Sequence, residues 1–331
     1  MESTDTLTTA TADEVYMYTG SGEVPKDVVS VHIHPSVTDI PASTFQNCRE
    51  LKNVTINEGL VTIGSWAFVG CSELQSISFP STLFQIGYSA FNGCANLREV
   101  VFNEGLKYIG TKSFEYCHSL ESINFPSTLL KISNLAFNTC GLRVVELNER
   151  IHMIEDHVFA GCTALREVIL LDEGVYNMGN MVFTHCPSLE SFKLPCLSTR
   201  LESILASPDQ RDVIMNKING IQRLEKRDSE LLIPARFVGY GVDWKLVRET
   251  LDRIINVLDY HEVKEATTSI ELAFWKAEVK SKAEEINHNE IDRRGCCIDV
   301  PGPVKDTILQ YLAFRIYPRG KREKQAFATN T

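Results

Sequence analysis

The sequence contains no run of about 18 apolar residues, the length that a helix needs to cross a bilayer. It also contains no Gly-x-Ser-x-Gly elbow, no phosphate-binding loop, no Gly-x-Gly-x-x-Gly fingerprint and no protein-kinase signature. The first absence predicts that the chain has no membrane partner. The other absences remove the common signatures of catalysis, so we expect no enzyme activity and name no catalytic residue.

Metal-site spacings are missing as well. No Cys-x-x-Cys occurs among the ten cysteines. His261 precedes Glu262 but lacks the second histidine that a zinc-protease helix requires. His32 and His34 could share one strand face and a metal, yet no third ligand is evident in the sequence. We favour the interpretation that both histidines are exposed at an edge of the fold, and we expect no metal and no cofactor.

Basic residues are scarce in the first part of the chain. The 33 lysines and arginines and the 43 aspartates and glutamates give a net charge of −10. Residues 198–331 hold 22 of the basic and 21 of the acidic residues, so residues 1–197 hold 11 and 22 and carry a net charge of −11. Because contacts to phosphates need basic surface, we predict no nucleic-acid partner for the first part.

A repeat fills most of the first 190 residues. Phe-x-x-Cys occurs seven times at steps of 22 to 24 residues, beginning at Phe45, Phe68, Phe91, Phe114, Phe137, Phe159 and Phe183. A fixed period in this range is typical of a solenoid, in which each repeat is one coil that buries its apolar residues against its neighbours.

One repeat reads approximately Ile-Gly-x-x-Ala-Phe-x-x-Cys-x-x-Leu-x-x-Val-x-Phe, followed by Pro-Ser-Thr-Leu or Asn-Glu-Gly-Leu. Its last apolar positions alternate, as in Val100 and Phe102, which predicts a half-buried strand ended by the Pro or Asn turn. The Ala-Phe-x-x-Cys piece predicts a helical turn. Strands of a parallel sheet lie ~4.7–4.9 Å apart, so equivalent residues form ladders, and the phenylalanine ladder should stabilise the array most.

These units resemble the BspA-type leucine-rich repeat family, whose repeats carry the same Ile-Gly-x-x-Ala-Phe-x-x-Cys-x-x-Leu pattern, over residues 29–197. The resemblance implies an α/β fold, a leucine-rich repeat solenoid with a parallel β-sheet. It also implies a general recognition scaffold, in a family that includes surface adhesins. The pattern departs at Gly141, Met178 and Phe192, so we expect altered coil geometry near the end of the array.

The period predicts three parts of the chain. Residues 1–28 are polar and threonine-rich, and we expect a frayed tail that runs into a cap. Residues 29–197 form the solenoid, whose first strand holds Val31 and Ile33. Residues 198–331 lack the period and are predicted to form a mostly α-helical C-terminal region.

Three helices are expected in that region. The first runs from Trp244 to Leu258, with its apolar residues on one face. A capping-box pattern beginning at Thr268 predicts a second helix, and Pro303 a third. The polar stretch 282–294 predicts a loop or an exposed helix end. The region is interpreted as a cap for the last coil, with a separate effector or dimerisation module as the alternative.

Seven of the ten cysteines belong to the repeat, namely Cys48, Cys71, Cys94, Cys117, Cys140, Cys162 and Cys186. Stacked coils would place neighbouring Cα atoms about 5 Å apart, inside the disulfide window of ~4.4–6.8 Å. Their number is odd, however, and one thiol per coil is what a small buried apolar residue supplies. Reduced, buried thiols are therefore favoured over disulfides.

The leading functional hypothesis is a non-enzymatic scaffold for protein–protein interaction. Its surface is formed by two columns of exposed strand positions that vary between coils: Lys52, Gln75, Arg98, Glu121, Arg143, Arg166 and Glu190, and Thr55, Ser78, Val101, Asn124, Glu146, Ile169 and Lys193. Unconstrained surface varies in the same way, so variation alone does not establish binding. The predicted binding residues are Val101 and Ile169, which are β-branched, and Arg143 and Arg166, which form a small positive spot. The partner is a protein of unknown identity.

Two alternatives stay open. The chain could be an adhesive or surface structural protein, as the family resemblance allows. The helical half could instead make a homo-oligomer that displays the array. The polar start Met1–Asp5 has no apolar core of a secretory signal, and with reduced thiols this leads us to expect a cytoplasmic location.

Overall fold

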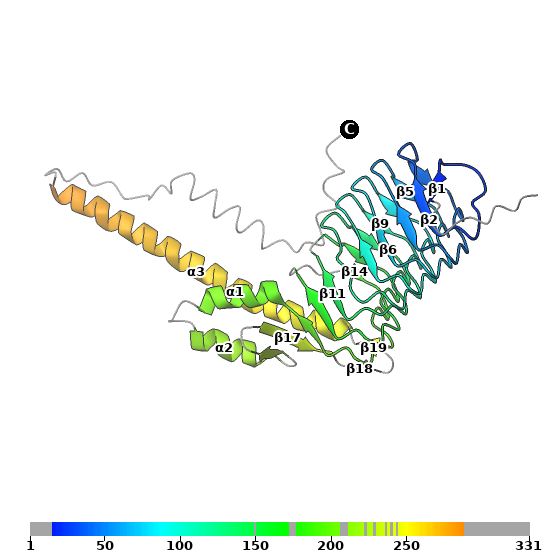
Figure 1. Cartoon of the computed structure of the whole chain (residues 1–331). Helices are drawn as coiled ribbons and strands as arrows, with labels where there is room; N and C mark the ends of the chain where they lie inside the picture. The colour runs from blue at the N-terminus through cyan, green and yellow to red at the C-terminus, as the bar shows by residue number, and fades with distance from the viewer. Residues whose placement is uncertain are drawn as a thin grey trace, which may run out of the picture. The chain divides into compact units, whose positions relative to one another are not determined.

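The computed structural model describes residues 15–148, 150–171, 177–205, 211–221, 224–227, 230–235, 237–238, 241–242 and 244–287 (Figure 1). The chain divides into two compact units, Met1–Thr267 and Thr268–Thr331, and each is described by itself. The first unit contains the repeats and the elements that follow them up to Thr267. In the second unit the description covers residues 268–287, which belong to helix α3 (Trp244–Asn287).

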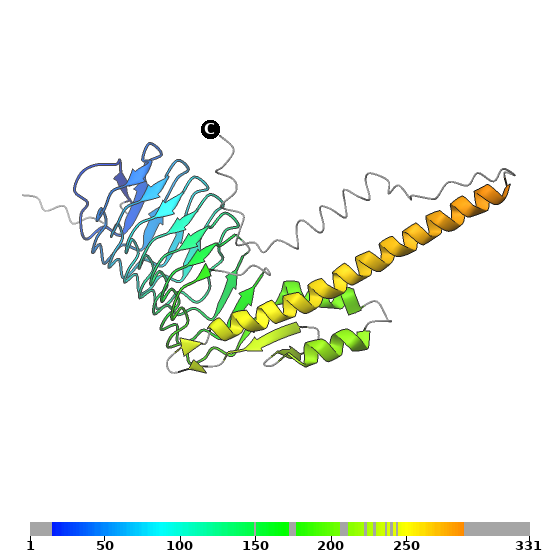
Figure 2. The ribbon, with the colours of Figure 1, turned by 180° about the vertical axis from the view of Figure 1, so that it is seen from behind.

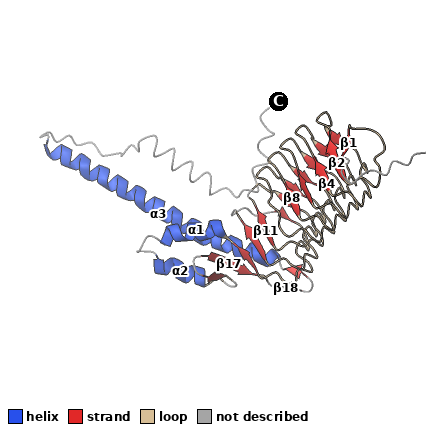
Figure 3. Ribbon diagram, in the orientation of Figure 1, coloured by secondary structure: helices blue, strands red, loops and turns tan. Residues whose placement is uncertain are grey.

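The repeats form a parallel β-solenoid of about seven turns, as the sequence predicts. One strand per coil builds the surface that we call the strand face (Figure 3). These strands are β1 (Val15–Tyr18), β2 (Ser30–Ile33), β4 (Asn53–Thr55), β6 (Ser76–Ser78), β8 (Glu99–Val101), β11 (Val144–Leu147), β13 (Glu167–Leu170) and β15 (Ser191–Lys193). They pair in parallel as β1–β2–β4, β6–β8 and β11–β13–β15.

A second set of two-residue strands forms what we call the second face. They are β3 (Asp39–Ile40), β5 (Thr62–Ile63), β7 (Gln85–Ile86), β9 (Tyr108–Ile109), β10 (Lys131–Ile132), β12 (Met153–Ile154) and β14 (Asn177–Met178). All seven pair in parallel in the order of the coils, and the same stack of coils is visible from behind in Figure 2. The core therefore lies between two walls of parallel strands.

The alternation of apolar residues decides which side chains enter this core. In β8, Val100 is buried, whereas Glu99 and Val101 are exposed. Successive side chains of a strand point to opposite sides, so the odd and even positions separate into core and surface. The strand face is therefore built from the variable columns that the sequence indicates.

One coil of the strand face lacks a strand. The sequence predicts a strand around Ile123, but residues 121–126 form none. The missing strand lies in the coil that precedes the one with a residue lost after Cys140. The two coils approach closely at Gly141, where a Cβ atom would lie 2.2 Å from the carbonyl oxygen of His118, so only glycine fits there.

The predicted phenylalanine spine runs through the whole array. The rings of Phe45, Phe68, Phe91, Phe114, Phe137, Phe159 and Phe183 stack nearly parallel with centroids 4.8–5.8 Å apart. Tyr18 covers the first ring edge to face at 5.3 Å, so β1 caps the N-terminal end of the spine. The part of the predicted tail that the structure describes, from residue 15, thus belongs to the stack.

The Ala-Phe-x-x-Cys piece forms consecutive turns in the structure instead of the predicted helical turn. The amide of Phe91 donates to the carbonyl of Ser113 in the next coil, and the amide of Cys94 donates to the carbonyl of Phe91. Left-handed backbone conformations recur before each phenylalanine, for example at Ser89 with φ of 50°. Because these amides bond to the next coil, no continuous helix can form.

Alternate turns are joined by hydrogen bonds between coils. The carboxylate of Glu58 accepts from the amide and the hydroxyl of Ser81, at 3.2 and 3.1 Å. Glu104 repeats this contact with Ser127, at 3.0 and 2.9 Å, and these bonds lower the pKa of Glu104. These contacts explain why turns of sequence Asn-Glu-Gly-Leu alternate with turns of sequence Pro-Ser-Thr-Leu. The glutamate of the first kind of turn accepts hydrogen bonds from the serine of the second kind, one coil later.

The C-terminal region is less helical than predicted. After β15 the chain forms α1 (Pro195–Leu205) and α2 (Arg211–Asn219), then strands β16 (Glu225–Arg227), β17 (Glu230–Pro234), β18 (Phe237–Val238) and β19 (Gly241–Val242). Strand β17 pairs antiparallel with β15 and with β16. The last coil is therefore continued by an antiparallel hairpin, which the helical prediction missed because a lone hairpin leaves no period in the sequence.

Helix α3 corrects the expected helix boundaries. The first predicted helix is present, but the second does not begin at Thr268, because one helix runs without a break from Trp244 to Asn287. No Gly or Pro occurs over this range, so nothing stops the helix before the capping-box pattern. The predicted helix at Pro303 and the stretch after Asn287 lie outside the described residues.

Ionic contacts fasten α3 to α1 within the first unit. Arg200 of α1 bonds Asp259 and, through Nη2 at 2.9 Å, Glu262 of α3. The ammonium of Lys217 in α2 lies 4.4 Å from the centroid of the Tyr260 ring. The side chain of Arg200 is only 11% exposed, so its contacts with the two carboxylates are shielded from water. These contacts fix the position of α1 against α3.

Candidate functional site

The four predicted binding residues all lie on the strand face, but they do not form one site. Val101 of β8 is 39% exposed and borders a hollow of about 240 Å³ formed by residues 99–102 and 122–124. Ile169 of β13 is half-buried. Arg143 and Arg166 are exposed just before β11 and β13 and share a larger hollow.

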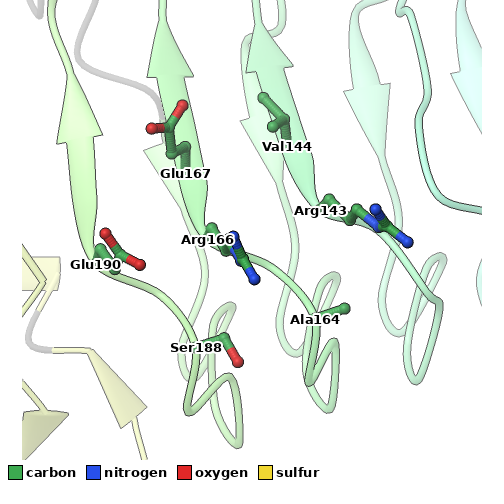
Figure 4. Close-up of a pocket in the computed structure, with 7 residues that line it drawn as sticks. All are labelled: Arg143, Val144, Ala164, Arg166, Glu167, Ser188 and Glu190. Atoms are coloured by element: carbon green, nitrogen blue, oxygen red, sulfur yellow. The ribbon is translucent and has the colours of Figure 1, made fainter.

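That larger hollow, which we call the arginine hollow, has a volume of about 570 Å³. It is lined by Arg143, Val144, Ala164, Arg166, Glu167, Ser188 and Glu190 (Figure 4). The amide of Arg166 donates to the carbonyl of Arg143, and the amide of Glu190 donates to the carbonyl of Arg166, so three neighbouring coils hold these side chains side by side. The hollow is thus positioned by the backbone ladder of the array.

The charge of the hollow is mixed, whereas the sequence indicated a positive spot. Arg143 Nη2 lies 3.0 Å from Glu121 Oε1, but both side chains are about 60% exposed. An ion pair this exposed contributes ~0–1 kcal/mol, so a ligand carboxylate can replace Glu121. Arg166 and Glu190 have no side-chain partner among the described residues.

The other carboxylate of the hollow is already engaged. Glu167 bonds the ammonium of Lys193 at 3.1 Å, and this hydrogen bond raises the pKa of Lys193. The hollow therefore presents one guanidinium and one carboxylate that are free, a weakly held second guanidinium and the hydroxyl of Ser188. These groups suit the recognition of a partner's charged side chains. Ser188 lies outside the predicted columns, and Glu190 belongs to one of them without being among the four predicted binding residues. The approach of these side chains to the arginines depends on how the coils stack, which the sequence does not show.

The cysteine ladder is buried, and its thiols are free. Each Sγ lies against the backbone of the preceding coil, for example Cys94 Sγ at 3.3 Å from the carbonyl oxygen of Phe68. Burial raises the pKa of Cys71 and of Cys186 to about 12. A thiol held as neutral S–H and shielded from solvent is a poor nucleophile, so the ladder has a structural role.

Alkylation provides a test of this ladder. At about pH 8 we expect the native chain to leave the seven ladder thiols unmodified, because all seven are buried away from the reagent and the raised pKa of Cys71 and Cys186 also suppresses their thiolates. Exposed Cys196 is the internal control and should be labelled. Mass spectrometry should show labelling of all seven once guanidinium chloride unfolds the chain and exposes these thiols to the reagent. Ladder labelling in the native protein would contradict this picture.

The two N-terminal histidines have local hydrogen-bond partners. His32 Nε2 lies 3.1 Å from Asn57 Nδ2, and His34 Nδ1 lies 2.7 Å from the hydroxyl of Ser36. No group of three metal-ligating side chains occurs among the residues that the structure describes. In the same part of the chain, α3 and the other helices lack the combination of length and hydropathy that crosses a membrane.

The stacked parallel coils and the repeated Phe-x-x-Cys pattern define a leucine-rich repeat protein. The chain belongs to the BspA type leucine rich repeat family, whose model matches residues 25–141 and 85–206 with six copies. The family assignment made from the repeat pattern is therefore confirmed.

Solved structures of several bacterial proteins are similar to this chain. The leucine-rich repeat protein of T. pallidum is 29% identical, with a TM-score of 0.44, over 48% of this chain and 77% of that one. A leucine-rich cell surface protein of Faecalibacterium prausnitzii is 24% identical, with a TM-score of 0.34, over 50% and 60% of the two chains. The pneumococcal vaccine antigen PcpA is 21% identical, with a TM-score of 0.28, over 50% of this chain and 61% of that one. The comparison with curated proteins gave no match.

Proposed function

We propose that the chain is a non-enzymatic scaffold that binds a protein partner on the strand face of its leucine-rich repeat array. The arginine hollow carries this proposal, because it lies on the predicted surface and contains two of the four predicted residues. Membership of a repeat family that serves in interaction or surface modules supports the same class of role. The exposed Val101 adds a second contact point on the same face.

The proposal assigns recognition, without catalysis, to the hollow. Its lining contains arginine, glutamate, serine, valine and alanine, and it contains neither histidine nor cysteine. A free guanidinium beside a free carboxylate complements a partner surface that bears charges of both signs, which favours specificity and fast association. We extend the proposal to a cytoplasmic location, which is supported by the free thiols of the ladder and can be checked by cell fractionation.

Charge reversal in the hollow should remove the partner. We expect Arg143→Glu/Arg166→Glu to lose at least tenfold in affinity for a partner captured from native lysate, because both guanidinium groups at the site are inverted. The matched control is Arg98→Glu, an exposed residue in the same column that lies outside the hollow. Affinity-tag capture with quantitative mass spectrometry compares the three proteins.

The pattern of loss discriminates between the hypotheses. A partner lost with the double variant but kept with Arg98→Glu supports the hollow. A partner kept by both variants contradicts the proposal and directs attention to the C-terminal region. The surface-protein and homo-oligomer alternatives remain predictions, which fractionation and analytical ultracentrifugation test separately.

A further inference from the structure

The second face of the array carries an exposed aromatic patch, far from the chemistry of the arginine hollow. It consists of Trp66, Phe84, Tyr88 and Tyr108, from three successive coils, and each residue is 39–44% exposed. The rings of Trp66 and Tyr88 meet edge to face at 5.2 Å, and those of Phe84 and Tyr108 at 5.3 Å. Both pairs adjoin the short strand β7, which pairs with β9 through Tyr108.

Charged residues are few in the part of the sequence that holds Trp66, Phe84 and Tyr88. Between Glu58 and Arg98 it contains one charged residue, Glu73, whereas on the side of Tyr108 the patch is bordered by Lys107 and by Lys131, which pairs with Tyr108. Cores of protein interfaces are depleted in charge and enriched in Trp, Tyr and Phe, whereas solvated surface is not. The composition of the patch is therefore that of a binding surface.

The backbone conformation at Trp66 also bears on the role of this side chain. Its φ is 58°, in the left-handed region, and the adjacent coils hold Ser43 and Ser89 at the same position with φ of 61° and 50°. The later coils hold Lys112, Leu135, His157 and Met181 at this position with φ of 53–58°, so the fold accepts residues of very different size there. Because 44% of the Trp66 side chain is exposed, much of the ring contributes nothing to the core. The fold therefore does not require a tryptophan at this position, and its exposed ring is available to a ligand.

The patch also offers hydrogen-bond donors. The indole N–H of Trp66 and the hydroxyls of Tyr88 and Tyr108 have no acceptor within the described part of the chain. Trp and Tyr at interfaces commonly combine an apolar ring with such a donor. A matching ligand must present apolar groups to the rings and acceptors to the three donors, and it needs no charge.

The area of the patch limits what can cover it. An aromatic side chain has roughly 150–250 Å² to bury, so four that are about 40% exposed offer roughly 250–400 Å². A stable interface buries ~800 Å² on each partner. The patch is therefore too small for a second copy of this chain and fits a short segment.

We propose that the aromatic patch binds an uncharged, proline-rich segment of a partner protein in the polyproline II conformation. That conformation has no internal hydrogen bonds, so its carbonyl oxygens are available to the indole and phenol donors. Its proline rings pack on exposed aromatic faces, and the preformed helix loses little entropy on binding. This inference is independent of the strand-face proposal, because it uses other residues on the other wall of the array.

Decaproline is the probe for the test. Fluorescence anisotropy of a labelled decaproline peptide, titrated with the full chain, should show saturable binding. In a ¹⁵N-labelled sample the peptide should shift the indole resonance of Trp66 and leave those of Trp244 and Trp275 in place. A Gly-Ala decapeptide is the control and should not bind, because it supplies carbonyls without proline rings or a preformed helix.

Substitutions taken from neighbouring coils keep the fold intact while removing rings. Trp66→Ser copies Ser89, and Tyr88→Thr copies Thr111. Each should weaken decaproline binding at least tenfold, whereas Arg166→Glu should bind as the wild type does. Thermal melting checks that the variants stay folded. No decaproline binding by the full chain, equal binding by Trp66→Ser, or loss in Arg166→Glu would each overturn the proposal, and none of these results bears on the strand-face partner.

Discussion

Replacing Phe91 with alanine is expected to lower the free energy of unfolding by about 3–5 kcal/mol. The ring is fully buried and stacks between Phe68 at 5.0 Å and Phe114 at 5.1 Å, with Phe79 edge-on at 5.6 Å. Removing it leaves a cavity in the middle of the spine. Since each coil of a solenoid is stabilised by its neighbours, the coils on both sides should loosen as well.

Equilibrium denaturation in urea measures this loss, and hydrogen exchange reports the loosening of adjacent coils. The matched control is Phe84→Val, since Phe84 is 43% exposed and Val61 occupies the same position one coil earlier. Its effect should stay within ~0.5 kcal/mol, as for most surface substitutions. An unfolding midpoint of Phe91→Ala equal to that of the wild type would falsify the spine as the main stabilising ladder.

Removing residues 198–331 is expected to make the array aggregate. Strand β17 covers the edge of β15, where Phe192 pairs with Ile233, and this hairpin is lost in the fragment 1–197. Leu194 and Leu197, both buried, lose the rest of α1. An uncovered strand edge beside exposed apolar residues is a template for association between chains.

The fragment 1–267 is the control for this truncation. It ends at the boundary between the two compact units and keeps the hairpin, α1, α2 and the contacts of Arg200 with Glu262. We expect it to be soluble and to melt cooperatively, whereas 1–197 should elute as aggregate in size-exclusion chromatography. A soluble, cooperatively melting 1–197 fragment would show that the hairpin and helices are not the cap.

The repeat could be predicted from the sequence because its contacts are local to the period. Phe68, Phe91 and Phe114 lie 23 residues apart, which is one coil, so their rings stack on one another. The same repeat pattern predicts the other contacts of the spine. The alternation of Val100 between Glu99 and Val101 likewise assigns the core and the surface. The predicted columns of the strand face follow from this alternation.

Non-periodic contacts were beyond the sequence. The pairing of β15 with β17 joins a repeat strand to a hairpin with no pattern of its own, so the region was predicted to be mostly helical. The break expected before Thr268 is absent because a capping-box pattern inside a run without Gly or Pro cannot end a helix. No short sequence motif predicts either the pairing of β15 with β17 or the unbroken helix α3.

The candidate site shows the same division. The sequence placed Arg143 and Arg166 on one face, since both occupy the same column of the repeat. It did not show that Glu121 pairs with Arg143, or that Glu190 leaves its carboxylate beside a free guanidinium. Those facts depend on side-chain directions on adjacent coils, which a repeat pattern does not determine.

The sequence by itself determined the family, the coil, the buried ladders and the acidic character of the array, because apolar periodicity and composition are local properties. Only the tertiary structure decided the hairpin that continues the last coil, the unbroken helix α3, the mixed charge of the arginine hollow and the pairing of Trp66 with Tyr88 and of Phe84 with Tyr108. The physical reason is that these features arise from packing between side chains of different coils and elements, whose geometry is settled when the chain folds.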